Sequence, residues 1–337
     1  TLGFLQPMGN TNLMTGILAP FQPQLPLEEL VLEVNQLYHA VEARDYDQRH
    51  PEVREQLPPL WQEMIDQAHL NRQPEQWRIL DFGCGTGFEA EQLIRNLPQG
   101  SIGQLICYDA SPEMLAQCRA NIAPLCPTAR FTSNLRAIPT EQPFNLLVTN
   151  SLLHHLPDPL ATIHGLSSLL DQEAFWLAGH EPSSRFYRNQ ECQKLYNLFL
   201  QERQWRKFLS PERYLQRLRQ AFGLESNPAN RAAKEAFRKG LFKQKPSALA
   251  IGRLVDFHVA HSLEEATSGR GFDIELMQTD FAADWQLVWL KTYSFMGAFY
   301  EGSLPKHWQQ SCYNLGQRFP KDGANFCTIW RRVAQTA

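Results

Sequence analysis

Apolar residues between positions 76 and 182 form short continuous runs that alternate with segments of helical periodicity. The clearest runs, at 78–82 and 144–149, are typical of buried strands. Strands separated by helices of this length indicate parallel crossover connections and a sheet covered on both faces. The fold class is therefore α/β: a Rossmann-like, doubly wound, mostly parallel seven-stranded sheet with helical lid insertions. The segments with strand character are 78–82, 104–108, 129–132, 144–149, 174–179, 273–279 and 325–333.

The segments outside this alternation are helical or Gly/Pro-rich. Residues 1–27 resemble an extended arm, and helices are predicted at 27–43, 59–70, 186–208, 211–222, 229–240, 247–267 and 285–315. The predicted domains are an N-terminal arm and helical lid segment (1–75), the sheet core (76–182), a helical insertion (183–268) and C-terminal core strands (269–337) with a second helical insertion at about 284–318. Long insertions on such sheets usually stand over the carboxyl ends of the strands. We therefore expect them to supply the substrate pocket, with aromatic walls from Trp285, Trp289, Tyr293, Phe295, Phe299 and Tyr300.

Composition narrows the class of protein. Of 337 residues, 43% are hydrophobic and 20% charged, and the net charge of −3 disfavours a nucleic-acid binder. There is no apolar run of the ~18 residues that a membrane span needs and no recognisable signal peptide. The chain starts at Thr1, which suggests an excised domain, a processed terminus or a trimmed chain. Seven scattered cysteines without a CxxC pair exclude a zinc finger or disulfide scaffold, so a cytoplasmic enzyme is predicted.

Basic residues concentrate in residues 203–245. This segment holds twelve Lys or Arg and three Glu, a net charge of +9, which leaves −12 for the rest of the chain. A solvated helical face is the ordinary explanation. The alternative is a lid that meets an acidic partner, such as a carrier protein, a phosphorylated cofactor arm or RNA.

The sharpest chemical signal is a glycine-rich loop between a strand and a helix. Gly83, Gly85 and Gly87 have G-x-G-x-G spacing, which differs from the dinucleotide fingerprint G-x-G-x-x-G. Asp81 precedes the loop, where it would repel a pyrophosphate but attract a cationic ammonium group. Asp109, 22 residues after Gly87, ends the next strand, where an acid accepts hydrogen bonds from ribose hydroxyls.

At these residues the chain resembles the class I S-adenosylmethionine-dependent methyltransferases. The resemblance extends over about residues 76–182, through Asn134 and the stretch 144–158, which contains His154 and His155. It implies S-adenosyl-L-methionine as the cofactor. No metal ion is expected, although His180 with Glu181 could join a metal site in three dimensions, since some methyltransferases use a divalent ion. The residues that it assigns to the cofactor are Asp81, Gly83, Cys84, Gly85, Gly87, Asp109, Ala110, Met114, Asn134, Leu135 and Asn150.

Two further residues resemble a catalytic pair. Carrier-linked C-methyltransferase domains of polyketide assembly lines place a His after the fourth strand and a Glu at the end of the fifth, positions that match His154 and Glu181. The resemblance implies methyl transfer to a small organic or carrier-tethered acceptor in secondary-metabolite biosynthesis, with His154 as general base. The alternative bases are His155 and Glu181 acting directly. His258 and His261 share a helix face, as metal ligands sometimes do, but a packed or surface pair is favoured.

Other functions stay open at this stage. The sequence does not distinguish carbon, oxygen or nitrogen as the acceptor atom. N-methylation and RNA methylation remain alternatives, as does a non-catalytic binding module that keeps the fold. A nicotinamide oxidoreductase is the remaining rival.

Overall fold

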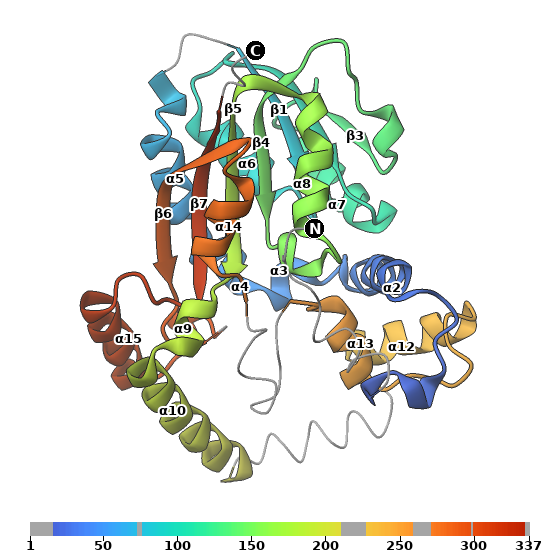
Figure 1. Ribbon diagram of the computed structural model, residues 1–337, viewed down its shortest axis with the longest axis vertical. Helices are drawn as coiled ribbons and strands as arrows, with labels where there is room; N and C mark the ends of the chain where they lie inside the picture. The colour runs from blue at the N-terminus through green and yellow to red at the C-terminus, as the bar shows by residue number, and fades with distance from the viewer. Residues whose placement is uncertain (1–15, 73–75, 210–226, 259–270, 298, 334–337) are drawn as a thin grey trace.

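The computed structural model describes residues 16–72, 76–209, 227–258, 271–297 and 299–333 (Figure 1). A seven-stranded sheet with the order β3-β2-β1-β4-β5-β7-β6 forms the centre. β1 to β5 are parallel, whereas β7 runs antiparallel to both β5 and β6. The strands are β1 (Trp77–Phe82), β2 (Ile102–Tyr108), β3 (Arg130–Thr132), β4 (Phe144–Asn150), β5 (Leu170–Pro182), β6 (Trp285–Tyr293) and β7 (Asn325–Arg332). The predicted mostly parallel α/β fold is confirmed.

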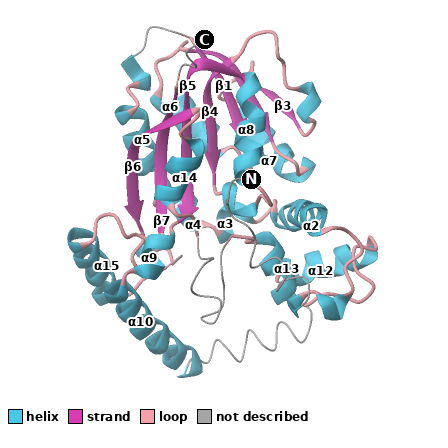
Figure 2. Ribbon diagram, in the orientation of Figure 1, coloured by secondary structure: helices cyan, strands magenta, loops and turns pink. Residues whose placement is uncertain are grey.

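Helices cover both faces of this sheet, as Figure 2 shows. One face packs against α5 (Leu57–Gln67), α6 (Phe88–Asn96) and α7 (Pro112–Ile122), with residues such as Trp61 and Phe88 in the core. The other packs against α8 (Pro159–Leu166) and α14 (Ile274–Phe281), around three stacked or edge-packed tryptophans. Burial of these large side chains on both faces is the main stabilising contribution to the sheet.

Two further helical groups have cores of their own. The first contains α2 (Leu27–Glu42), α12 (Pro228–Arg238) and α13 (Ala248–Val255), and the second contains α9 (Ser184–Arg188), α10 (Gln190–Leu209) and α15 (Lys306–Arg318). Both lie beyond the carboxyl ends of the parallel strands (Figure 1). The expected position of the helical insertions is therefore confirmed for these elements. Short helices complete the chain: α3 (Tyr46–Arg49), α4 (Pro51–Glu55), and the 3-10 turns η2 (Ala19–Phe21), η3 (Leu70–Arg72), η4 (Leu135–Ala137), η5 (Leu153–His155), η6 (Ser167–Leu169) and η7 (Glu301–Ser303).

Two predictions near the C-terminus are wrong. The segment 273–279, predicted as a strand, is helix α14, because Asp273 caps it at the Glu275 and Leu276 amides. Its buried residues Ile274, Met277 and Phe281 follow helical spacing. The predicted helix 285–315, and with it the helical insertion at about 284–318, begins instead with strand β6. The predicted helices 211–222 and the second half of 247–267 lie outside the described residues.

Candidate active site at the carboxyl edge of the sheet

The glycine loop after β1 is fixed to the end of β2 by backbone hydrogen bonds. The Gly83 and Cys84 amides donate to the Tyr108 carbonyl at 2.8 and 2.9 Å. Gly85 and Gly87 have φ angles of +50° and +91°, which glycine adopts without strain. A Cβ atom at Gly85 would meet nothing within 4 Å, so the loop leaves open space on that side.

Asp109 lies directly after β2 and faces this loop. Its carboxylate accepts hydrogen bonds from the Gly85 amide at 2.9 Å and the Ser111 amide at 2.8 Å. Burial raises the pKa of Asp109 to about 6, against the opposing effect of these two amides. Each carboxylate oxygen accepts one of these bonds and keeps a second lone pair, as the predicted contact with ribose hydroxyls requires.

The environment of the Asp81 carboxylate shows whether a cationic cofactor would fit this site. The residue is fully buried on β1, and neither carboxylate oxygen makes a hydrogen bond of ordinary geometry within the described chain. Burial, together with the nearby Glu89 carboxylate, raises the pKa of Asp81 well above its usual range. A buried carboxylate without a partner is costly. The ammonium group of S-adenosyl-L-methionine would supply that partner, so the residues present fit this cofactor.

The remaining predicted cofactor residues occupy three different environments. Met114 is buried in the first turn of α7, whereas Ala110 and Leu135 are exposed on the loops after β2 and β3. The Asn134 carboxamide oxygen already caps η4 by accepting from the Arg136 amide at 3.0 Å. That oxygen keeps a second lone pair, so the Asn134 carboxamide can still accept a hydrogen bond from a ligand. Asn150 accepts from the indole of Trp61 at 3.3 Å.

Sequence reasoning missed two residues next to the loop. Glu89 is buried in the first turn of α6, and burial raises its pKa to about 8. Asp47 on α3 accepts from the Thr86 hydroxyl at 2.8 Å, which fixes the N-terminal segment against the glycine loop. The helices α3 and α4 span only 46–49 and 51–55, too short for a periodic signal.

His154 and Glu181 are brought together as predicted. The His154 Nδ1 atom lies 2.8 Å from a Glu181 carboxylate oxygen, at the ends of the neighbouring strands β4 and β5. Glu181 is fully buried and also accepts from the Leu152 and Leu153 amides, both at 2.8 Å. One carboxylate thus holds both the η5 turn and the imidazole. Burial alone lowers the pKa of His154, but the Glu181 charge outweighs it and the net pKa is raised.

The other histidines of this edge are held differently. His155 Nδ1 lies 2.7 Å from the Val255 carbonyl, which only accepts, and burial lowers its pKa to about 4. His258 donates from Nε2 to the Leu156 carbonyl at 2.8 Å, and burial lowers its pKa to about 4. His261, its predicted partner, lies outside the described residues. The described residues hold one group with ligand atoms close enough for a metal ion: His154, His155 and Asp256.

Backbone strain marks the same edge. Of the five non-glycine residues with positive φ in the described chain, three lie at the carboxyl ends of β4, β5 and β6: Ser151, His180 and Ser294. Such conformations cost about 1–2 kcal/mol each and cluster at functional sites.

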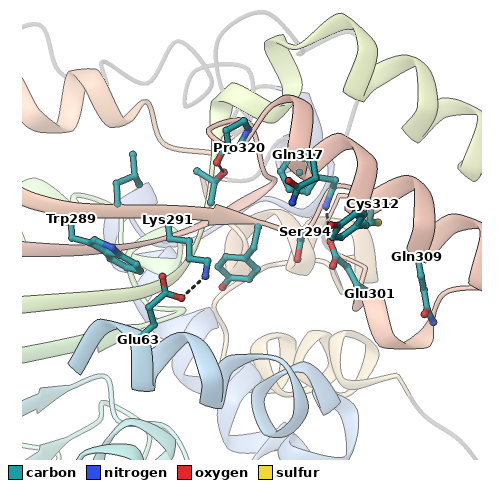
Figure 3. A pocket seen from close by; sticks show the side chains of 15 residues that line it. Glu63, Trp289, Lys291, Ser294, Glu301, Gln309, Cys312, Gln317 and Pro320 are labelled. Carbon is teal, nitrogen blue, oxygen red and sulfur yellow. Dashed lines mark hydrogen bonds and ion pairs between the residues drawn. The ribbon is translucent and has the colours of Figure 1, made fainter. Parts of the chain in front are cut away.

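The predicted aromatic wall is only partly assembled. A cavity of about 500 Å³ lies between α5, β6 and α15, and Trp289, Tyr293 and Phe295 line it (Figure 3). Lys291 pairs with Glu63 across its mouth. The prediction is wrong for Trp285, which is buried against Trp176 at the opposite end of β6. Phe299 packs against Phe199, and the Tyr300 hydroxyl donates to Glu55.

Comparison with known proteins bears on the family of the sheet domain. Residues 80–175 match a family model described as a methyltransferase domain. Residues 80–175 therefore form part of a class I S-adenosylmethionine-dependent methyltransferase domain. The malonyl-[acyl-carrier protein] O-methyltransferase of Magnetococcus marinus is 34% identical over 98 residues, 29% of this chain and 35% of that protein. A ubiquinone biosynthesis O-methyltransferase of Xanthomonas campestris is 31% identical over 97 residues, 28% of this chain and 38% of its own.

The chain spans between 35% and 46% of the length of the first curated relatives it matches. Among solved structures, the plantazolicin methyltransferase BpumL with a triazolic desmethylPZN analog and SAH aligns with 92% of this chain and 98% of its own. That alignment has a TM-score of 0.45 at 12% identity. None of the described helices is long and apolar enough to cross a membrane.

Proposed function

We propose that this protein transfers a methyl group from S-adenosyl-L-methionine to a small organic or carrier-tethered acceptor, with His154 as the general base. The observation that carries the proposal is the buried Glu181 carboxylate bonded to His154 Nδ1 at 2.8 Å, at the same sheet edge as the orphaned Asp81 carboxylate and the glycine loop. When bound, the cofactor supplies an activated methyl group whose sulfur is a good leaving group.

The chain's own residues orient the reactants and accept a proton. Asp81 and Asp109 would hold the ammonium and ribose groups, because charge-assisted hydrogen bonds are the strong ones. Glu181 accepts a hydrogen bond from His154 Nδ1–H, which leaves the Nε2 lone pair to take the proton of the acceptor. The Glu181 carboxylate stabilises the imidazolium that then forms, and the raised pKa of His154 reflects this. A positioned base of this kind contributes typically about 10²–10⁴-fold.

The acceptor class is a finer part of the proposal. The printed names of the relatives include a methyltransferase for malonyl groups on a carrier protein, and a carrier-bound or polyketide-like acceptor fits a basic surface close to the site. Exposed cations on and after α12, among them Lys234, Lys239 and Lys243, would face an acidic carrier. All seven cysteines are free, which supports a cytoplasmic location.

The test combines cofactor binding with turnover. Calorimetry should give binding of S-adenosyl-L-methionine to the wild-type chain. Release of S-adenosylhomocysteine should then be screened over free hydroxy compounds, 1,3-dicarbonyl compounds and acyl-carrier-protein thioesters. His154→Ala should lower turnover of the acceptor found by about 10²–10⁴-fold with cofactor affinity nearly unchanged.

A second histidine–carboxylate pair provides the matched control. His164 on α8 lies 2.7 Å from Asp284, in the turn before β6 and far from the glycine loop. His164→Ala should therefore leave turnover unchanged. Equal activity of His154→Ala and wild type would contradict the assigned base. Cofactor binding without turnover of any acceptor would favour a non-catalytic binding module.

A further inference from the structure

His180 stands beside the proposed base but is held by different groups. It occupies the irregular part of β5 between Ala178 and Glu181, where its φ of +54° is left-handed. Its Nδ1 atom lies 2.6 Å from the hydroxyl of Tyr293, at the end of β6. The structure gives Nε2 no hydrogen bond among the described residues, and the side chain is partly exposed. The imidazole of His180 also interacts electrostatically with four nearby groups: Glu52, His154, Glu181 and His50.

The partners of Tyr293 decide where the proton of His180 lies. The Cys327 thiol approaches the Tyr293 oxygen at 3.9 Å, and burial raises the pKa of Cys327 to about 11, so the thiol keeps its proton and can donate it. Burial also raises the pKa of Tyr293 well above its usual range, so the phenol keeps its proton too. The Tyr293 oxygen accepts from the thiol, and among the described residues His180 Nδ1 is the remaining partner for the phenol's own proton, so the Tyr293 hydroxyl donates to His180 Nδ1. The 2.6 Å separation fits an O–H donor, which makes shorter bonds than an N–H donor.

The two histidines therefore have opposite tautomers. His154 carries its proton on Nδ1, toward Glu181, and presents a bare Nε2. His180 accepts at Nδ1 and carries its proton on Nε2, where it can donate. Burial lowers the pKa of His180 to about 4, so the ring is neutral at pH 7 and acts as a donor without giving up its proton.

We propose that His180 Nε2–H donates a hydrogen bond to an oxygen of the acceptor that becomes negatively charged as the acceptor loses its proton, and that Tyr293 is the positioning residue that fixes this tautomer. This inference rests on the proposed function. His154 takes the acceptor's proton, the freed electron pair forms the bond to the methyl carbon, and the carbon–sulfur bond breaks with its pair left on sulfur. In an enolate or a phenolate the charge lies on an oxygen during this step, and a neutral donor stabilises it.

The proposal therefore names the acceptor class. An enolisable carbonyl compound or an acidic hydroxyl compound would use both histidines. An amine would not, because its nitrogen becomes positive during transfer and gains nothing from a donor. The pair of tautomers thus favours carbon or oxygen over nitrogen as the methylated atom.

The first experiment measures the tautomers directly. Nitrogen-15 NMR of the histidine-labelled chain, saturated with S-adenosylhomocysteine, should show a neutral Nε2–H form for His180 and an Nδ1–H form for neutral His154. His180→Asn assigns the His180 signal, since Asn tolerates the left-handed backbone better than other residues. In Tyr293→Phe the Nε2–H preference of His180 should be lost, whereas the exposed Tyr313→Phe should leave it unchanged. An Nδ1–H form of His180 in the wild-type chain overturns the proposal.

The second experiment measures contact with the acceptor class. Titration with acetylacetone or phenol should shift the His180 Nε2–H resonance, and aniline at equal concentration should not. No shift with either oxygen compound, or an equal shift with aniline, overturns the proposal. Failure of the chain to bind S-adenosyl-L-methionine would instead defeat the proposed function, and the tautomer spectrum would still be interpretable.

Discussion

At the residue scale, two carboxylates next to the glycine loop are buried, an arrangement that a cationic ligand would stabilise. Asp81 has no hydrogen bond of ordinary geometry within the described chain, and Glu89 is buried beside it. Protein interiors avoid this arrangement because a buried charge without a partner is costly. The protein can fold with these carboxyl groups buried because they can bind protons and become neutral. A cationic ligand would stabilise their charged form.

Asp81→Asn should therefore separate stability from binding. The folded pKa of Asp81 lies well above its unfolded value of about 3.9, so the unfolded chain loses this proton first as pH rises. The wild-type apo protein then loses stability above about pH 4, and the variant does not. We expect urea unfolding at pH 8 to show a more stable apo variant, with a smaller difference at pH 5. Calorimetry should show cofactor affinity about 10- to 150-fold weaker, the value of one charged hydrogen bond of roughly 1.5–3 kcal/mol. Asp66→Asn, on the surface of α5, is the control, and equal stability of the Asp81 variant and wild type at pH 8 would refute the raised pKa.

The contribution of His50 to the stability of the folded protein should fall with rising pH because its raised folded pKa favours the charged form, whereas Asp81 loses stability because its raised pKa favours the neutral form. Burial lowers its pKa, but hydrogen bonds to Glu42 and Glu52 outweigh this and raise it to about 9. A folded pKa above the unfolded value of about 6.5 gives stability that is complete below pH 6.5 and is lost as pH rises toward 9. His50→Gln should therefore lose stability relative to wild type at pH 6 and converge with it at pH 9.5, as measured by urea unfolding. The exposed His307→Gln should follow wild type throughout, and a constant difference for His50→Gln would contradict the explanation.

At the element scale, the turn after β4 is where separate parts of the chain are joined. The buried side-chain amide of Asn35 on α2 donates to the carbonyls of His155 and of Leu254, on η5 and α13. The η5 turn, which contains the proposed base His154, is thus held by Glu181 from the sheet and by Asn35 from the N-terminal helix. This explains why a segment 120 residues away in sequence can fix the position of His154.

Asn35→Ala should test this connection. The substitution leaves two buried carbonyls without their donor, at a cost of about 1–3 kcal/mol. Urea unfolding should show that loss, and turnover should fall with it because the η5 turn becomes less ordered. Asn230→Ala on the exposed surface of α12 should change stability by less than about 0.5 kcal/mol. A loss for Asn35→Ala no larger than this would show that α2 is not needed to hold the turn.

The elements that sequence predicts well and those it misses differ in a physical way. The strands at 78–82 and 144–149 are mostly apolar on both faces because both faces are covered, and their ends carry the glycine loop and His154. The sequence predicts a helix where β6 forms, because the four residues 287–290 are all apolar. In the structure β6 lies at the edge of the sheet and is only partly buried. A continuous apolar run shows neither the period of two of a half-buried strand nor the period of 3.6 of an amphipathic helix. The partnership of His180 with Tyr293 depended on that missed strand, so no sequence pattern pointed to it.

At the scale of the whole molecule, charge is divided between the two helical groups at the carboxyl edge. The group around α12 carries exposed Lys234, Lys239, Lys243 and Lys245, together with Arg238, which pairs with Glu235. The described cations at the other group are partly neutralised, as by the pairs of Arg206 with Glu202 and of Arg318 with Glu191. The predicted basic segment 203–245 is thus described at its two ends, since 210–226 lies outside the described residues. A positive surface beside the site would attract an acidic partner and bring its tethered group to His154.

The double variant Lys239→Glu with Lys243→Glu tests that surface. If the acceptor arrives on an acidic carrier protein, reversing two exposed charges should lower kcat/KM for the carrier-bound acceptor by about tenfold or more at low salt. The loss should come mainly from a slower association rate, because exposed charges steer the encounter of the two proteins. The same acceptor on a short uncharged thioester should be methylated at the wild-type rate, since neither lysine is part of the site. The matched control is Lys306→Glu with Lys321→Glu, an equal charge change at exposed positions on and after α15, at the other side of the carboxyl edge (Figure 1). An equal loss from both double variants would indicate a general field effect. Equal activity of all the variants on the carrier-bound acceptor would show that the basic surface is a solvated helical face.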